Sequence, residues 1–383
     1  MSFDFDTVIN RRDTDSRKWH KYSGRDILPL WVADTDFASP PAVTAALQRR
    51  VAHGVFGYGV TEPAAVAEAV VAHCARHYHW TIQPEWIVWL PGLVCGLNVA
   101  AAAYGADGDE VLTCTPAYPP FLGAPGNQRR RTVTAPLARR DGRWEIDFAA
   151  LAAAVTPRTR QFFFCHPHNP TGRVFTRPEL EAVAAFCERH DLVVTSDEIH
   201  CDLILDPVAH LPLASLSPAI AARTVTLMAP SKTYNIPGLG CSYAIIPDAA
   251  LRARFEPSYG SIVPDVNVLG FVAAEAALRE GEPWRQALLA YLRGNRDYLA
   301  AFVAAELPGV ALSRVEATYL AWLDVSALEL AQPAGFFEGH GVGLSDGAAF
   351  GAAPGTFVRL NFGCPRATLA EACARLKRAL AAR

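Results

Sequence analysis

The feature that most constrains the fold of this chain is an alternation of short apolar strands with helices along its middle. Five apolar runs of strand length, each followed by a turn signal, occupy residues 86–90, 110–114, 161–165, 192–196 and 224–228. Apolar spacings of three and four residues predict helices at 41–50, 94–104, 177–190 and 265–280. This alternation favours an α/β fold, in which helices cover both faces of a mainly parallel sheet.

The pattern changes after about residue 284. A long helix is predicted over 284–307, and strands over 317–325 and 356–362 then alternate with helices over 334–340 and 367–381. This second arrangement of helices and strands indicates a smaller α+β unit. We therefore expect three parts, which are an N-terminal arm of residues 1–45 that belongs to the small domain, a large domain of 46–285, and a small C-terminal domain of 286–383.

Composition and charge exclude several classes of protein. With 51% hydrophobic and 19% charged residues among 383, the chain can bury a large core and is not disordered. A net charge of −3 and one short basic run at 129–131 disfavour binding to nucleic acid or to an anionic membrane. No apolar stretch approaches the roughly 20 residues that span a bilayer, and the N-terminus lacks the apolar core of a signal peptide. We expect a cytoplasmic protein that binds neither membrane nor nucleic acid.

The cysteines point to a reducing compartment and not to a metal site. Nine of them are scattered along the chain without a C-x-x-C pair, mostly in apolar segments. This usage is typical of small buried hydrophobic residues in the cytoplasm. His166, His168 and the pair His200–Cys201 lack the spacing of a zinc site, so no metal is expected.

Lysine is rare here, because only four of the 35 basic residues are lysines. Where this chain needs an ordinary positive charge it uses Arg. A Lys kept in a turn-rich loop therefore suggests a need for an amine that can lose its proton. Lys18, Lys21 and Lys377 lie in polar or amphipathic segments and are predicted to be solvated. Lys232 is the exception.

Polar residues follow four of the predicted strands, where ligands of open parallel sheets bind. Gly92 begins a helix after the first strand, Asn169 lies in a turn after the third, Asp197 follows the fourth and Lys232 the fifth. Each alone has an ordinary explanation as a turn residue, a helix cap or a surface lysine. Together they offer a helix start for a phosphate, a carboxylate for a pyridinium nitrogen and an amine for a Schiff base, which pyridoxal 5′-phosphate (PLP) requires.

The segments around these residues resemble the fold-type I, aspartate aminotransferase-like superfamily of PLP enzymes, the class I/II aminotransferases. Several are characteristic of its MalY/PatB-type branch, the cystathionine β-lyases or cysteine-S-conjugate β-lyases. The resemblance implies a large domain with a mainly parallel seven-stranded sheet between helices, beside the smaller α+β domain. The matching segments are FDTVINRRDTDSRKW, LPLWVADTDF, FGYG, PHNPTGRV, SDEIHCDL, APSKTYNIPGLG and VRLNFGCPR.

The resemblance also implies how the cofactor ring would be held. Lys232 would bind it as a Schiff base and then move the substrate proton. Asp197 would keep the pyridine nitrogen protonated, so that the ring draws electrons from the substrate. Tyr118 would stack on the ring face, and Asn169 would hydrogen-bond its 3′-oxygen with help from His200.

For the cofactor phosphate, the resemblance implies the backbone N–H groups of Gly92, Leu93 and Val94 and the hydroxyl of Ser231. Tyr58 would reach the phosphate of the neighbouring subunit, which makes a homodimer part of the active site. One departure concerns Gly240, which stands where many aminotransferases carry a phosphate-binding Arg.

On the substrate side, the resemblance implies that Arg359 clamps the carboxylate of an amino acid bidentately, and that Ala33 and Asp34 line the pocket. A second Arg for a dicarboxylic substrate is not evident in the sequence, so a specialist for aspartate is disfavoured.

Three functions are compatible with these residues. The first is a carbon–sulfur β-lyase that eliminates a thiol from L-cystathionine or another cysteine S-conjugate and yields pyruvate and ammonia. The second is an aminotransferase for a neutral or aromatic amino acid. The third is a PLP-binding regulatory protein, which the full catalytic set disfavours. The sequence does not name the sulfur substrate or the ratio of elimination to transamination.

Overall fold

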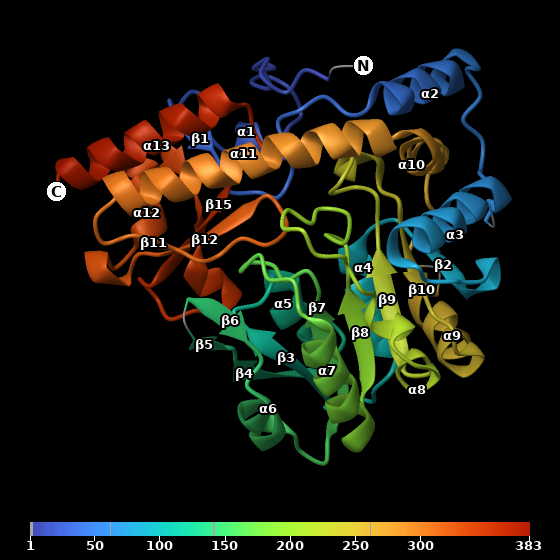
Figure 1. The fold of residues 1–383 in the computed structure, drawn as a ribbon. Coiled ribbons are helices and arrows are strands. Elements are labelled where there is room, and N and C mark those ends of the chain that lie inside the picture. The colour runs from blue at the N-terminus through green and yellow to red at the C-terminus, as the bar shows by residue number, and fades with distance from the viewer. Residues whose placement is uncertain (1–2, 62, 141, 261) are drawn as a thin grey trace.

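The predicted α/β alternation forms a central seven-stranded sheet in the computed structural model, which describes residues 3–61, 63–140, 142–260 and 262–383 (Figure 1). All neighbouring strands are parallel except the second in the order, which is antiparallel to both of its neighbours. The order is β2 (Ile87–Leu90), β10 (Ser242–Ile245), β9 (Thr224–Met228), β8 (Val193–Asp197), β7 (Thr159–Cys165), β3 (Glu110–Thr115) and β4 (Arg131–Pro136). The predicted mainly parallel sheet is confirmed.

Two strands of this sheet were not predicted from the sequence. The β10 run has only four residues and lies between turn signals, while β4 is an edge strand with a mixed burial pattern. Neither run is long enough for its pattern of apolar residues to distinguish a strand from a loop.

Helices cover the sheet on both faces, and β7 shows how the sequence produces this. Phe163 packs in one core cluster with Leu97 of α4, while Phe162 and Phe164 pack in another with Leu180 of α7. A continuous apolar run is expected for a strand that is buried on both sides. The helices of this part of the chain are α3 (Ala64–Tyr78), α4 (Leu93–Ala103), α5 (Pro119–Asn127), α6 (Phe148–Ala154), α7 (Arg177–Arg189), α8 (Pro218–Ala221), α9 (Ala249–Phe255) and α10 (Val268–Glu280).

A second sheet of four antiparallel strands lies beside the long helix α11 (Glu282–Glu306) (Figure 1). Its order is β11 (Ala311–Leu312), β12 (Leu320–Asp324), β15 (Phe357–Asn361) and β14 (Ser345–Asp346). Two further helices belong to this part, α12 (Pro333–Gly339) and α13 (Arg366–Ala381), and a small hairpin joins β5 (Ala138–Arg140) to β6 (Arg143–Glu145). The predicted helices and strands of the C-terminal part are thus present within a few residues of their expected bounds.

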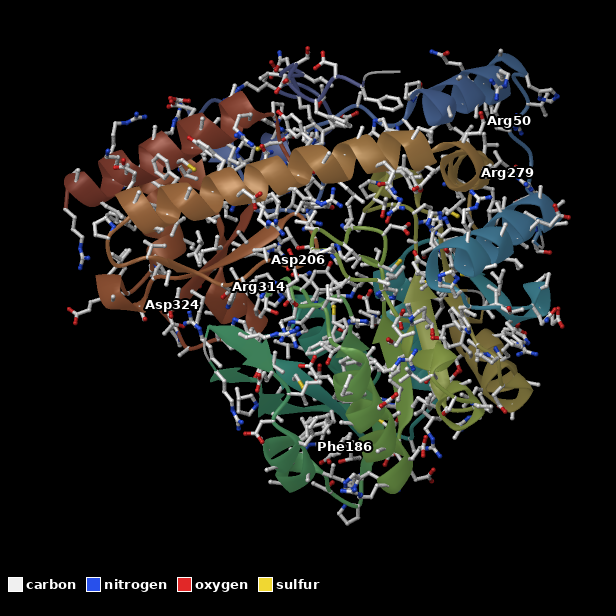
Figure 2. All side chains as sticks on the ribbon, in the orientation of Figure 1. Arg50, Phe186, Asp206, Arg279, Arg314 and Asp324 are labelled. Atoms are coloured by element: carbon white, nitrogen blue, oxygen red, sulfur yellow. The ribbon has the colours of Figure 1, made fainter. Side chains whose placement is uncertain are left out.

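The arm and the two sheets are tied together by backbone and ionic contacts. The arm strand β1 (Leu28–Pro29) pairs in parallel with β13 (Val342–Gly343). Asp206, after β8, pairs with Arg296 of α11 at 2.6 Å and with Arg314 at 2.7 Å (Figure 2). The division into 1–45, 46–285 and 286–383 stays a prediction, and its boundaries fall inside α2 (Pro41–Ala52) and α11.

The arm itself is more ordered than its sequence indicated. It contains the short helix α1 (Arg17–His20), and Lys18 is fully buried, so the expectation that this lysine is solvated was wrong. Its Nζ lies 2.8 Å from Asp36 Oδ2 and donates to the Asp34 carbonyl oxygen, while Arg11 pairs with both carboxylates. Burying the Asp36 carboxylate requires cations beside it, and that requirement places Lys18 inside.

The nine cysteines are free, and eight of them are buried. Burial raises the pKa of Cys114 and Cys241 to about 12, which keeps both thiols protonated. Within the described ranges, His, Cys, Asp and Glu form no group of three or more that could hold a metal ion. No helix of those ranges is long and apolar enough to cross a membrane.

Candidate active site

The carboxyl ends of β7, β8 and β9 and the start of α4 surround one pocket, as expected for an open parallel sheet. Ten of the thirteen residues predicted for the site line it. They are Ala33, Gly92, Leu93, Val94, Tyr118, Asn169, Asp197, His200, Ser231 and Lys232.

Lys232 follows β9 in the chain and points its amine toward the N-terminal arm. Its Nζ donates to the Ala33 carbonyl oxygen at 2.6 Å. Burial lowers the pKa of Lys232 to about 8, and the positive charge of Arg359 acts in the same direction, while Asp34 and Asp197 oppose it. A sizeable fraction of the amine is therefore neutral near physiological pH, as a nucleophile or base requires.

This pKa predicts how cofactor-free protein should bind PLP. Only the neutral amine attacks the cofactor aldehyde, so the rate of recovery of visible absorption should rise about tenfold from pH 7 to 9, with a midpoint near 8. Stopped-flow absorbance with excess PLP measures this rate. A rate that is flat over this range would contradict a lowered Lys232 pKa, and an exposed lysine would give a curve still rising at pH 10.

Asp197 is the last residue of β8 and lies in register with Cys165 of β7 and Leu227 of β9. Its Oδ1 accepts a hydrogen bond from the Ile199 backbone N–H at 3.1 Å. Burial raises the pKa of Asp197 to about 7. A buried carboxylate of this kind is stabilised by a cation beside it, which fits a protonated ring nitrogen.

The start of α4 fits a phosphate. Gly92 caps this eleven-residue helix, and the first backbone N–H groups of a helix have no partner inside it. A Cβ added at Gly92 would meet no protein atom within 4 Å, so this position borders open space. Gly240 lines the same pocket with φ +57°, and a Cβ there would approach the Pro91 carbonyl oxygen to 3.0 Å. The loop therefore favours glycine where many aminotransferases carry Arg.

Arg359 of β15 is not part of the pocket wall, but its guanidinium donates hydrogen bonds to residues beside the pocket. Its Nη1 donates to Asn169 Oδ1 and its Nη2 to the Trp31 carbonyl oxygen, both at 2.9 Å. Burial lowers the pKa of Arg359 to about 10, which leaves it cationic at neutral pH. Nη1 keeps a second N–H, and the buried Nε has no hydrogen-bond partner among the described residues, whereas Nη2 also lies 3.5 Å from Ser345 Oγ. The guanidinium can therefore still receive a carboxylate through Nη1 and Nε. Because the Asn169 amide oxygen accepts from Arg359, its NH₂ group remains available to donate a hydrogen bond to a ligand.

His200 lines the pocket as a neutral ring, because burial lowers its pKa to about 3. Its Nδ1 is buried and has no hydrogen-bond partner among the described residues. Such an orphan atom fits a site that a polar ligand completes. Tyr118, the N-cap residue of α5, lies in the same wall, and burial raises the pKa of its hydroxyl.

The structure places the remaining predicted residues elsewhere. The Tyr58 side chain is fully exposed and is not part of the pocket wall of its own subunit. Asp34 lies outside the pocket wall and pairs with Arg11 at 3.1 Å and with Lys18 at 3.5 Å. Its negative charge nevertheless acts to raise the pKa of Lys232.

Sequence reasoning did not select several residues of this site. Cys165, Ile199, Pro237, Cys241 and Ser242 also line the pocket. Cys165 and Ile199 neighbour predicted polar residues at the strand ends, and that adjacency was the available signal.

The segment 31–37, which carries Ala33, is held by side chains from distant parts of the chain. Asn235 accepts from the Thr35 N–H, Asn361 donates to the carbonyl oxygens of Val32 and Asp34, and Tyr319 donates to the Ala33 carbonyl oxygen. No local sequence pattern indicates these contacts.

The family of class I and II aminotransferases matches residues 25–376 of this chain. Cystathionine beta-lyase PatB of Bacillus subtilis (strain 168) is 39% identical over 98% of this chain and 99% of its own length. A crystal structure of OvoB superposes with a TM-score of 0.96 at 50% identity and covers 100% of both chains. Cystalysin from Treponema denticola, whose crystal structure contains PLP, superposes with a TM-score of 0.95 at 32% identity over 100% of both chains.

These matches extend over nearly the whole chain, and the pocket holds the helix start, carboxylate and lysine that PLP requires. Fold and cofactor are thus those predicted from the sequence. The chain belongs to the PLP-dependent class I and II aminotransferase family, and within it to the branch of the PatB- and MalY-type cystathionine β-lyases.

Proposed function

We propose that this protein is a carbon–sulfur β-lyase that acts on L-cystathionine or other cysteine S-conjugates. The proposed chemistry rests on one observation. The Lys232 amine, whose burial lowers its pKa to about 8, lies in the same pocket as the Asp197 carboxylate and the start of α4. The preference for carbon–sulfur cleavage is supported by the relatives, because PatB and the Corynebacterium glutamicum relative are both named cystathionine β-lyases.

In this proposal, bound PLP supplies an electron sink for the bonds at the substrate Cα. Arg359 would bind the substrate carboxylate, and Asn169, whose amide oxygen is held by Arg359, would donate to the ring oxygen. Asp197 would face the ring nitrogen, Tyr118 would cover the ring, and Ser231 with the start of α4 would hold the phosphate, since all of them line the pocket.

Lys232 then moves a proton. Its neutral amine would take the Cα proton of the substrate, and its pKa would allow it to return a proton to a leaving group at neutral pH. When the Cβ–S bond breaks, the bonding electrons leave with sulfur, which becomes a thiol on protonation. With one water, a cysteine S-conjugate thus yields one thiol, one pyruvate and one ammonium ion.

The experiment that tests this function is a product assay on the purified holoenzyme with L-cystathionine. Pyruvate and free thiol should appear in equal amounts and over many turnovers without any added keto acid. The alternative, an aminotransferase for a neutral or aromatic amino acid, predicts one turnover without pyruvate, followed by a requirement for a keto acid. Stoichiometric thiol and pyruvate would exclude that alternative as the main activity.

We also propose that the enzyme is a cytoplasmic homodimer in which Tyr58 reaches the partner's active site. Segment 51–60 exposes Val51, Val55, Phe56, Tyr58 and Val60 by half or more of their surface. A contiguous run of exposed apolar side chains is typical of a protein–protein interface. The nine free cysteines support a reducing compartment.

The dimer is tested by light scattering after size exclusion. The protein should elute at twice the 41.4 kDa chain mass, and the double variant Val55→Asp, Phe56→Asp should elute as a monomer with weakened cofactor binding. Val208→Asp, which changes a similarly exposed valine elsewhere, is the control and should leave the mass unchanged. A wild-type monomer that retains full activity would contradict a shared active site.

A further inference from the structure

The N-terminal arm carries six cations between residues 11 and 25, and most of them are committed to carboxylates. Arg11 and Lys18 pair with Asp34 and Asp36. Lys21 and Arg25 pair with Glu338, at 3.6 Å and 3.1 Å. The other two cations of this segment are Arg12 and Arg17.

Arg17 differs from Arg12 in where it lies. Arg12 contacts Trp19 and donates to the Arg25 carbonyl oxygen, on the arm itself. Arg17 is exposed and, among the described residues, its guanidinium has neither an ion pair nor a hydrogen bond. It lies over the ring of Trp31, with its Cζ 5.9 Å from the ring centroid. At that distance, close to the limit of a cation–π contact, its N–H donors stay uncommitted.

Trp31 connects Arg17 to the substrate side of the pocket. The carbonyl oxygen of Trp31 accepts a hydrogen bond from Arg359, the residue that would bind the substrate carboxylate. Trp31 also lies two residues before Ala33 in the chain. Ala33 lines the pocket, and its carbonyl oxygen accepts a hydrogen bond from Lys232. Arg17 therefore lies next to the segment that faces the substrate.

The charge of Arg17 reaches the pocket wall. Burial raises the pKa of Tyr118, and the positive charges of Arg359 and Arg17 both partly oppose that rise. Tyr118 is thus within electrostatic reach of both the cation assigned to the amino-acid carboxylate and a second, unpaired cation. An uncommitted guanidinium next to this segment is suited to a planar anion.

We propose that Arg17 is a specificity-determining residue that selects cysteine S-conjugates whose sulfur substituent carries a carboxylate. This inference rests on the proposed lyase function and adds the substrate class. Arg359 would hold the carboxylate of the cysteine half, and Arg17 would hold the carboxylate of the departing half. The sequence alone did not reveal this second Arg, because Arg17 comes near the pocket only through its contact with Trp31.

The test compares substrates that differ only in charge. S-(2-Carboxyethyl)-L-cysteine and S-(2-carbamoylethyl)-L-cysteine have the same length and shape, and the S-carboxymethyl and S-carbamoylmethyl pair shortens the reach by one methylene. Pyruvate release gives kcat and KM for each. Wild-type holoenzyme should prefer at least one carboxylate over its amide by about tenfold in kcat/KM, mostly through KM. The preference should shrink at high salt, since Arg17 is exposed.

Arg17→Gln should reduce that preference to within about twofold while leaving kcat/KM for the amides unchanged, and Arg17→Lys should keep part of it. Arg12→Gln, which removes the other arm cation without a carboxylate partner, is the matched control and should behave as wild type. An equal loss for acid and amide substrates, or no loss for either, would overturn the role of Arg17. Failure of the wild-type enzyme to release pyruvate from all four conjugates and from L-cystathionine would instead overturn the lyase function.

Discussion

Replacement of Lys232 by alanine is expected to remove the visible absorption of the protein-bound cofactor and at least about 10⁴-fold of the lyase activity. The amine is the residue that would bind PLP covalently and move the substrate proton, so both properties disappear together. Absorbance spectra after incubation with PLP and a pyruvate assay measure the two effects.

The fold should tolerate this change. Lys232 is a buried amine whose pKa is lowered from 10.5 to about 8, so its charged form costs folding free energy below that pH, and alanine removes the cost. The Ala33 carbonyl oxygen keeps its second donor, the Tyr319 hydroxyl at 3.1 Å. The cofactor-free variant should therefore melt no lower than cofactor-free wild type at pH 7. Lys377→Ala, a change at an exposed lysine of α13 that pairs with Glu306, is the control and should retain colour and activity. Full absorbance in Lys232→Ala would refute the assignment.

Replacement of Asp197 by asparagine should lower kcat about 10²- to 10³-fold and also weaken PLP binding. Asparagine can still accept the Ile199 N–H, so the turn after β8 is preserved. It cannot supply a negative charge to a protonated ring nitrogen, and the cofactor then withdraws fewer electrons from the substrate. Steady-state kinetics and a spectrophotometric titration with PLP measure the two effects.

A matched substitution separates this effect from a general loss of charge. Asp191→Asn removes a carboxylate whose side chain is 95% exposed and which pairs with Arg223 on the surface. It should leave kcat and cofactor affinity within about twofold of wild type, because exposed ion pairs contribute little. If Asp197→Asn behaved like this control, the carboxylate would have no role at the ring.

The strand-end residues could be predicted because local sequence places them. Gly92, Asn169, Asp197 and Lys232 each follow an apolar run, and a parallel sheet brings such ends to one edge. The same reasoning missed β10, whose four residues carry no period that distinguishes them from a loop.

The arm was less predictable because its structure depends on distant partners. A polar segment with several charges reads as solvated, yet Lys18 is fully buried against Asp36. The contact that positions Arg17 is likewise tertiary, because Trp31 is held by Arg359 and Ser345, more than 300 residues away along the chain. Patterns within a window of a few residues do not contain this information.

Apolar periodicity and short motifs are local properties of a chain, so the α/β alternation, the polar residues at the strand ends and the family could be predicted from the sequence. Which charges are neutralised and which stay free is visible only in the folded chain. Arg11 and Lys18 are committed to Asp34 and Asp36, Arg359 lies behind Asn169, and Arg17 keeps its donors. Electrostatic pairing and burial depend on distance in space, and a sequence does not reveal that residues such as Arg359 and Asn169, 190 positions apart, are in contact.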